Sequence, residues 1–203
     1  MVVAGSKSIY ALNPETAEQY WTTPFETDSG CVVMTPIRHG DHVFIGAWNQ
    51  KGAVLKLTSD KPGVEVVWKN KEDHGLVPVN SQPFHQDGVV YGYDDNGTMY
   101  AVELPSGKRL WDGTGPVLGE MRRGAETAFI VKNGDRFFFF ADTGHLVIGK
   151  LSPKGYEETS RAKVIEPTGA ANGRKMVWSA PAYADKKAFI RNDKEIICVD
   201  LAR

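Results

Sequence analysis

The sequence has little cysteine, no excess of either charge and no long apolar run, and each absence excludes a class of protein. Cys31 and Cys198 stand far apart with no second cysteine near either, which argues against a disulfide-rich framework or a cysteine metal site. Two buried thiols are the favoured interpretation, with a disulfide between them as the alternative. Lys and Arg number 24 against 25 Asp and Glu, and they are scattered. The sequence therefore shows no basic patch of the kind that nucleic-acid-binding proteins carry.

Membrane and export signals are also missing from the sequence. No apolar run approaches the ~18 residues that a transmembrane helix needs. The opening residues, Met1 to Gly5, have neither a basic n-region nor an apolar h-region, so they are not a signal peptide. No segment of useful length has helical periodicity, and the many short period-2 segments predict an all-β protein.

What the sequence does contain is an internal repeat. Tyr10–Trp21 and Tyr100–Trp111 are matched phrases that open with Tyr-Ala-aliphatic, carry a hydroxyl residue at the sixth step and close on Trp. Apolar residues in equivalent settings lie at Leu55, Val147 and Ile197, so the spacing is roughly 45 to 50 residues. A period of that length is typical of four-stranded propeller blades.

Each repeat predicts four strands, A to D, joined by hairpins. Polar turns such as Asp94–Gly97 precede strand C, because residues like Asn and Gly supply the positive φ of tight hairpins. Pro36, Pro83 and Pro181 belong to strand A, and because proline cannot donate to a ladder we expect strand A at the edge of each sheet.

These patterns predict a β-propeller of four-stranded antiparallel blades, here an incomplete arc in which three full blades are flanked by two partial ones. We expect one partial propeller domain over residues 1–203. The expected blade parts are 1–24, 32–69, 79–111, 124–165 and 176–201. The two ends cannot complete one blade, because both contain strands B and C. We therefore expect a piece of a longer propeller, or self-association through open blade edges.

The two matched phrases resemble the pyrroloquinoline-quinone-type (PQQ-like) propeller repeat, aliphatic/aromatic-Ala-Leu-Asp-x-x-Thr-Gly-x-x-x-Trp. Asn13 and Glu103 stand where Asp is usual, and Ala17 replaces a glycine that Gly107 keeps. The resemblance implies that the Trp ending strand D docks onto the adjacent blade, with its indole N–H bonded to a backbone acceptor. The residues with this expected role are Trp21, Trp68 and Trp111. Glu158 occupies the fourth position, so we expect that junction to be looser, or packed by Tyr156.

No catalytic or metal-binding set is recognisable in the sequence. His39 and His42 are three apart on extended chain and would point to opposite faces, so surface histidines are the better interpretation. His74, His85 and His145 lack partners at ligand spacing. Asp94–Gly97 resembles a calcium loop only superficially, and no nucleophile–base pair is identifiable.

Two long connections offer a ligand-binding face. The D–A connection Asp112–Glu126 should lie at the same end of the propeller as the B–C turns. Together they predict a face for an anionic or peptide ligand, with exposed loops of no particular role as the alternative. Its candidate residues are Trp48, Asn49, Gln50, Arg122 and Arg123. The connection Glu166–Lys175 belongs to this face, and its small residues predict a mobile loop.

Two functions follow from these observations. The first is a non-catalytic scaffold, without cofactor, that binds a protein, peptide or glycan, as the repeat motif comes without a catalytic set. The alternative, implied by the resemblance, is part of a PQQ- and calcium-dependent quinoprotein dehydrogenase. Such enzymes often carry a vicinal Cys-Cys pair, which this chain lacks. By the same resemblance, the intact protein would be periplasmic or exported if it carries a signal sequence.

Overall fold

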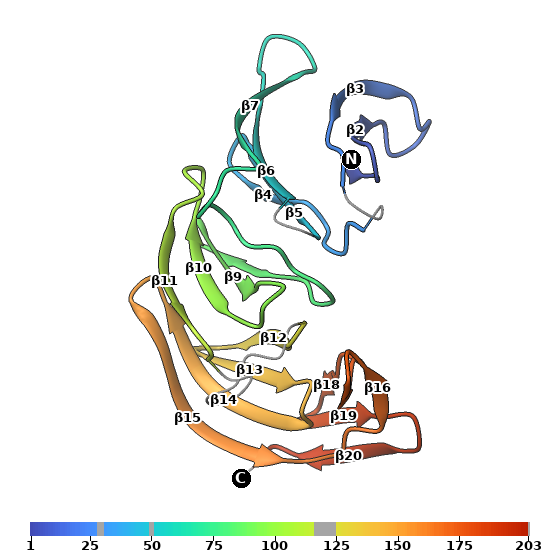
Figure 1. Cartoon of the computed structure of the whole chain (residues 1–203), viewed down its shortest axis with the longest axis vertical. Coiled ribbons are helices and arrows are strands. Elements are labelled where there is room, and N and C mark those ends of the chain that lie inside the picture. The colour runs from blue at the N-terminus through green and yellow to red at the C-terminus, as the bar shows by residue number, and fades with distance from the viewer. Residues whose placement is uncertain (28–30, 49–50, 116–124, 203) are drawn as a thin grey trace. The chain divides into compact units, whose positions relative to one another are not determined.

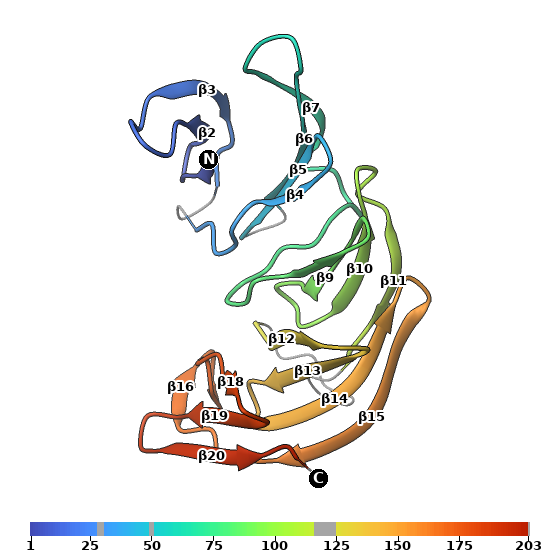
Figure 2. The ribbon, with the colours of Figure 1, turned by 180° about the vertical axis from the view of Figure 1, so that it is seen from behind.

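The computed structural model describes residues 1–27, 31–48, 51–115 and 125–202, and its elements are antiparallel β-strands (Figures 1 and 2). The chain divides into two compact units. The first comprises Met1–Asp95 with Met99–Asp112, and the second Asn96–Thr98 with Gly113–Arg203. The described part of the chain contains no helix that is long and apolar enough to cross a bilayer.

The first unit contains three sheets, each with its strands in sequence order. The three-stranded sheet consists of β1 (Val2–Ala4), β2 (Ser8–Leu12) and β3 (Gln19–Pro24). The next is four-stranded, with β4 (Ile37–His39), β5 (His42–Ala47), β6 (Lys51–Leu57) and β7 (Val64–Lys69). The third, also four-stranded, has β8 (Phe84–Gln86), β9 (Val89–Tyr93), β10 (Met99–Glu103) and β11 (Arg109–Gly113).

The second unit contains one four-stranded sheet, a hairpin and a three-stranded sheet. The four-stranded sheet consists of β12 (Ala128–Asn133), β13 (Arg136–Ala141), β14 (His145–Ser152) and β15 (Gly155–Lys163). The hairpin is β16 (Gly169–Ala171) with β17 (Arg174–Met176). The last sheet has β18 (Ala182–Ala184), β19 (Lys187–Arg191) and β20 (Ile196–Asp200). Three four-stranded sheets flanked by two of three strands confirm the predicted fold class.

Tight turns of the expected kind join the first two strands of each later sheet. Asp87 and Gly88, between β8 and β9, both have positive φ (50° and 77°). Asp185 and Lys186 do the same between β18 and β19 (49° and 58°). Positive φ at both central residues gives the turn the twist of the flanking strands.

Proline marks the edge of three sheets. Pro36, Pro83 and Pro181 stand directly before β4, β8 and β18, each of which is an edge strand. The edge position of strand A was predicted. The prolines themselves lie just outside the strands, where the missing N–H costs no ladder bond.

An aromatic residue recurs as the third residue of the second strand in each of the last four sheets. Phe44, Tyr91 and Phe138 are buried, with exposed fractions of 0%, 4% and 8%. Phe44 lies in one apolar cluster with Val90 of the following sheet, and Phe138 in another with Ala188 and Ile190 of the last sheet. Phe189 holds the same position in the last sheet and is 37% exposed. This sheet therefore has one face packed and one face open in the structure.

The expectation of an irregular loop over Glu166–Lys175 is wrong, because the segment contains strands. The segment contributes most of the β16–β17 hairpin, whose strands pair in register from Gly169 with Met176 to Ala171 with Arg174. Asn172 and Gly173 both have positive φ (49° and 71°) and form its turn. The Asn-Gly pair is a hairpin signal, and the small residues around it obscured that signal.

The predicted burial of the cysteines is also wrong. Cys31 and Cys198 are both exposed, and no disulfide joins them. Cys198 lies on β20, and its register partner is Phe189 on the open face of the last sheet.

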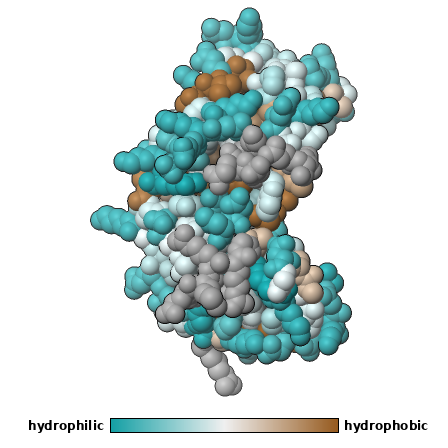
Figure 3. All heavy atoms as spheres, in the orientation of Figure 1, coloured by the Kyte–Doolittle hydropathy of each residue, from teal (hydrophilic) through white to brown (hydrophobic). Residues whose placement is uncertain are grey.

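Hydrophilic residues cover most of the molecular face drawn in Figure 3, with apolar spots between them.

Candidate functional site

Trp68, near the end of β7, makes a close contact between the second and third sheets. Its indole Nε1 donates a hydrogen bond to the Pro105 carbonyl oxygen at 3.1 Å. Its ring lies on the turn of the next sheet so closely that a Cβ atom on Gly107 would come within 2.5 Å of it. Gly107 also has positive φ (76°), so two independent constraints require glycine there.

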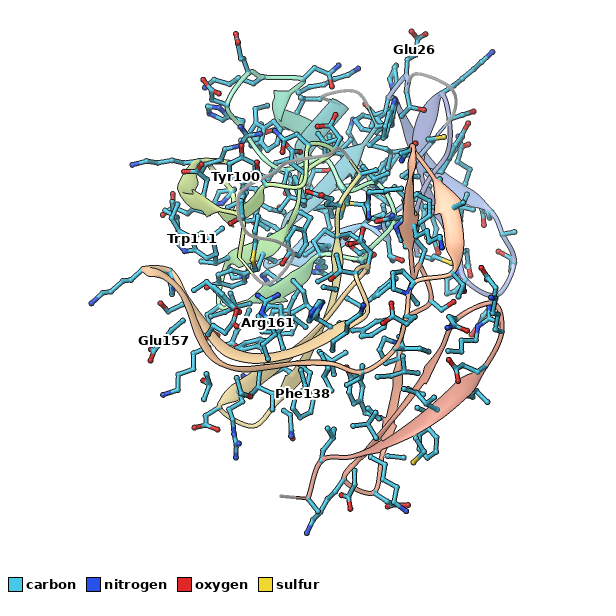
Figure 4. The ribbon with its side chains drawn as sticks, turned by 60° about the horizontal axis from the view of Figure 1, so that its bottom comes forward. Glu26, Tyr100, Trp111, Phe138, Glu157 and Arg161 are labelled. Atoms are coloured by element: carbon cyan, nitrogen blue, oxygen red, sulfur yellow. The ribbon has the colours of Figure 1, made fainter. Side chains whose placement is uncertain are left out.

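The other two tryptophans of the repeat have different surroundings. Trp21 packs against the apolar cluster between the first two sheets, which includes Ile9 and Val43. Trp111, labelled with Tyr100 in Figure 4, lies 6.2 Å from the ring of Tyr91 in its own sheet. Tyr156, beside the position that lacks tryptophan, packs edge-on against Phe139 of its own sheet at 5.3 Å.

Buried polar residues hold the connections at the end of the sheets where the second strand turns into the third. Asp94, directly after β9, is 2% exposed and accepts a 2.6 Å hydrogen bond from the Val77 amide. Arg109 lies 3.5 Å from its other oxygen and 4.0 Å above the ring of Tyr100. Burial raises the pKa of Asp94 to about 6, although the Val77 amide and Arg109 oppose the shift.

A second buried carboxylate anchors the hairpin of the second unit. Asp142, directly after β13, is fully buried, and the Arg174 guanidinium of β17 donates to it at 2.6 Å. The same guanidinium donates to the Ala125 carbonyl oxygen at 3.1 Å, and the Thr127 amide donates to Asp142 at 3.3 Å. Burial raises the pKa of Asp142, while Arg174 is the largest influence in the opposite direction.

The last sheet holds the other side of the hairpin. Asn192, directly after β19, donates through Nδ2 to the Glu166 carbonyl oxygen at 2.9 Å. The backbone amide of Asp193 donates to the Thr168 hydroxyl at 3.1 Å. The hairpin is therefore tied to the turns of two different sheets and is held as a defined surface feature.

A pocket of about 240 Å³ lies between this hairpin and the turn after β19. Its lining includes the small residues Gly169 to Ala171, the exposed turn residue Asp193 and Trp178, which is 39% exposed. A half-exposed indole beside small residues is an arrangement that commonly receives a partner side chain.

Of the predicted ligand-face residues, only Trp48 is described. It follows β5, is 36% exposed, and donates through its backbone amide to the Cys31 carbonyl oxygen at 3.3 Å. Asn49, Gln50, Arg122 and Arg123 lie outside the described residues. Sequence reasoning missed Trp178, which only the folding of the hairpin brings to a pocket.

The histidines make local contacts, with one pairing between sheets. His39 of β4 and His85 of β8 meet edge-to-face at 5.3 Å, and the Nε2 atom of His85 is buried without a hydrogen-bond partner. Burial lowers the pKa of His85, and His39 adds to this effect. His42 pairs with Asp41 at 2.7 Å. Among the described residues no group of three His, Cys, Asp or Glu side chains could hold a metal ion.

A family model matches nearly the whole chain. The model described as the outer membrane protein assembly factor BamB covers residues 5–203. The chain belongs to this BamB-like family of PQQ-repeat propellers. No curated protein matches the chain.

Solved structures show the same fold. BamB from Moraxella catarrhalis is 14% identical with a TM-score of 0.64, and the match covers 97% of this chain and 54% of that one. The computationally designed Ika8 protein is 12% identical with a TM-score of 0.58, covering 96% and 53%. A chain of the mitotic checkpoint complex is 11% identical with a TM-score of 0.62, covering 95% and 56%. This BamB-like chain thus spans about half the length of the structures that it matches, and it is a partial propeller.

Proposed function

We propose that this chain is part of a non-catalytic propeller that binds a protein partner, and that the β16–β17 hairpin with Trp178 is its contact site. The observation that carries the proposal is the anchoring of the hairpin by the buried Asp142–Arg174 pair at 2.6 Å. Rigid presentation of a contact surface lowers the entropy cost of association.

The chemistry of the hairpin surface supports a protein partner. Trp178 offers a large, stiff contact area that loses few rotamers on binding, and tryptophan is enriched among the residues that dominate interface energies. The pocket beside it, about 240 Å³, is below the size of most small-molecule sites and suits a single side chain. The name of the family, an assembly factor, is consistent with a partner that is a protein.

Site-specific photocrosslinking tests the proposal. A photoreactive amino acid replaces Trp178 in the full-length gene product, and Tyr20, an exposed aromatic residue of β3, is the matched control position. We expect a discrete protein adduct from position 178 in the cells that produce the protein, and none from position 20. No adduct from position 178, or the same adduct from both positions, would contradict the proposed contact site.

A further inference from the structure

A larger pocket lies between the last two sheets of the second unit, at the end where the first strand turns into the second. Its volume is about 420 Å³, within the range of small-molecule sites. It lies between the β12–β13 turn and the β18–β19 turn, and none of its lining residues is shared with the Trp178 pocket.

The floor of this pocket is apolar and partly aromatic. Phe138, labelled in Figure 4, stacks on Tyr183 across the two sheets, with ring centroids 5.2 Å apart and planes at 20°. Val131, the register partner of Phe138, and Leu201, which follows β20, complete the apolar lining. The Leu201 amide donates to the Lys186 carbonyl oxygen at 2.8 Å, which fixes the chain end against the turn.

The rim of the pocket is positively charged. Lys132, Lys186 and Lys187 line it, against a single carboxylate from Asp185. The ion pairs among the described residues include neither Lys186 nor Lys187. Ammonium groups around an apolar floor attract an anion that also carries an apolar group.

A polar group in the wall lacks a partner. Tyr183 lines the pocket, and its hydroxyl is shielded from solvent without a hydrogen-bond partner. A buried hydroxyl that makes no hydrogen bond is costly, and a ligand oxygen that reached it would offset that cost. Burial also raises the pKa of Tyr183, so the phenol keeps its proton and remains a donor.

We propose that this pocket binds an organic carboxylate whose aromatic or aliphatic group rests on Val131, Phe138 and Leu201. The carboxylate lies at the rim, with Lys186 and Lys187 as its cationic partners and Tyr183 in the wall behind them. A free small acid and the carboxyl terminus of a peptide with an apolar last residue share this chemistry. The site is independent of the proposed protein-binding hairpin.

Amide NMR of the full chain at low ionic strength tests this site with hydrocinnamate as the probe. We expect saturable shifts confined to the β12–β13 and β18–β19 turns, and none with the neutral hydrocinnamamide or with acetate at the same concentrations. N-acetylglycylphenylalanine and its C-terminal amide distinguish the two sources. Tighter binding of the peptide acid than of hydrocinnamate identifies a peptide terminus, and the reverse order identifies a free acid.

Substitutions locate the charge. Lys187→Gln should weaken hydrocinnamate binding at least about threefold, consistent with loss of one exposed charge contact. Lys194→Gln, in the β19–β20 turn of the same sheet, is the matched control and should leave the affinity unchanged. Equal binding of the acid and the amide, equal effects of the two substitutions, or no saturable shift at any probe concentration would each overturn the proposal.

Discussion

The contact between Trp68 and Gly107 gives the sharpest test of how adjacent sheets are joined. In Gly107→Ala the new Cβ would lie 2.5 Å from the indole of Trp68, and the residue would keep a φ of 76°. The left-handed backbone alone costs an alanine about 1–2 kcal/mol. Forcing the methyl group against a packed ring adds about 1–3 kcal/mol. The substitution should therefore lower the free energy of unfolding by about 2–5 kcal/mol.

A matched glycine separates the two contributions. Gly40 has a similar φ of 59° in the same unit, and nothing lies within 4 Å of the Cβ atom it would acquire. Gly40→Ala should therefore cost only the backbone share, about 1–2 kcal/mol. Ala17, at the equivalent position of the first repeat, already has a φ of 60°, so the fold tolerates the energetic cost of an alanine in the left-handed region.

A double-mutant cycle then identifies the ring as the obstacle. Trp68→Ala should itself cost about 3–5 kcal/mol through the cavity it leaves. In that background Gly107→Ala should cost no more than Gly40→Ala, because the clash has been removed. The assay is urea denaturation followed by circular dichroism, with hydrogen exchange of the β10 amides to localise the effect. An equal cost of Gly107→Ala with and without Trp68 would refute the reasoning.

Three further predictions concern ionisable groups that are buried or partly buried. Arg174→Ala leaves the Asp142 carboxylate buried and unpaired, so it should lower the free energy of unfolding by about 3–5 kcal/mol and speed hydrogen exchange in the hairpin. The control substitution Lys175→Ala, on the exposed face of the hairpin, should change neither quantity. Burial raises the pKa of Asp94 to about 6, so between pH ~4 and ~6 the folded state keeps a proton on this carboxyl that the unfolded state has lost. The free energy of unfolding should therefore fall as pH rises from ~4 to ~6, and Asp94→Asn should flatten its pH dependence over that range. The lowered pKa of His85 has the opposite effect on the pH dependence. The contribution of neutral His85 to the free energy of unfolding is complete above pH ~6.5 and is lost as pH falls below that value. His85→Asn should remove this loss in thermal melts recorded over a series of pH values.

Most of the fold could be predicted because each sheet is coded by local signals. Period-2 strands and turn residues recur in every full repeat, and a proline precedes strand A in two of the three full repeats and in the last partial one, so the strands of the flanking partial sheets were found as well. The hairpin at 169–176 was missed, because its two three-residue strands, Gly-Ala-Ala and Arg-Lys-Met, are too short to show apolar alternation. Its Asn172-Gly173 turn was the one available signal.

The candidate site could be predicted only in part, because its contacts join residues far apart in sequence. An Asp directly after a strand is an ordinary turn residue, and nothing in the sequence marks Asp142 as the partner of Arg174. The burial of Asp94 arises from the connection that folds over it, which local periodicity does not encode. Cys198 is exposed because it lies on the open face of the last sheet. Positions that are buried in the other sheets are not covered by a neighbouring sheet there.

The most direct test of the non-catalytic account is equilibrium dialysis of pyrroloquinoline quinone, with and without calcium, against this chain and the full-length product of its gene. The account predicts no saturable binding to either protein. Calcium-dependent binding near one equivalent to the full-length product would contradict it and identify the chain as part of a quinoprotein.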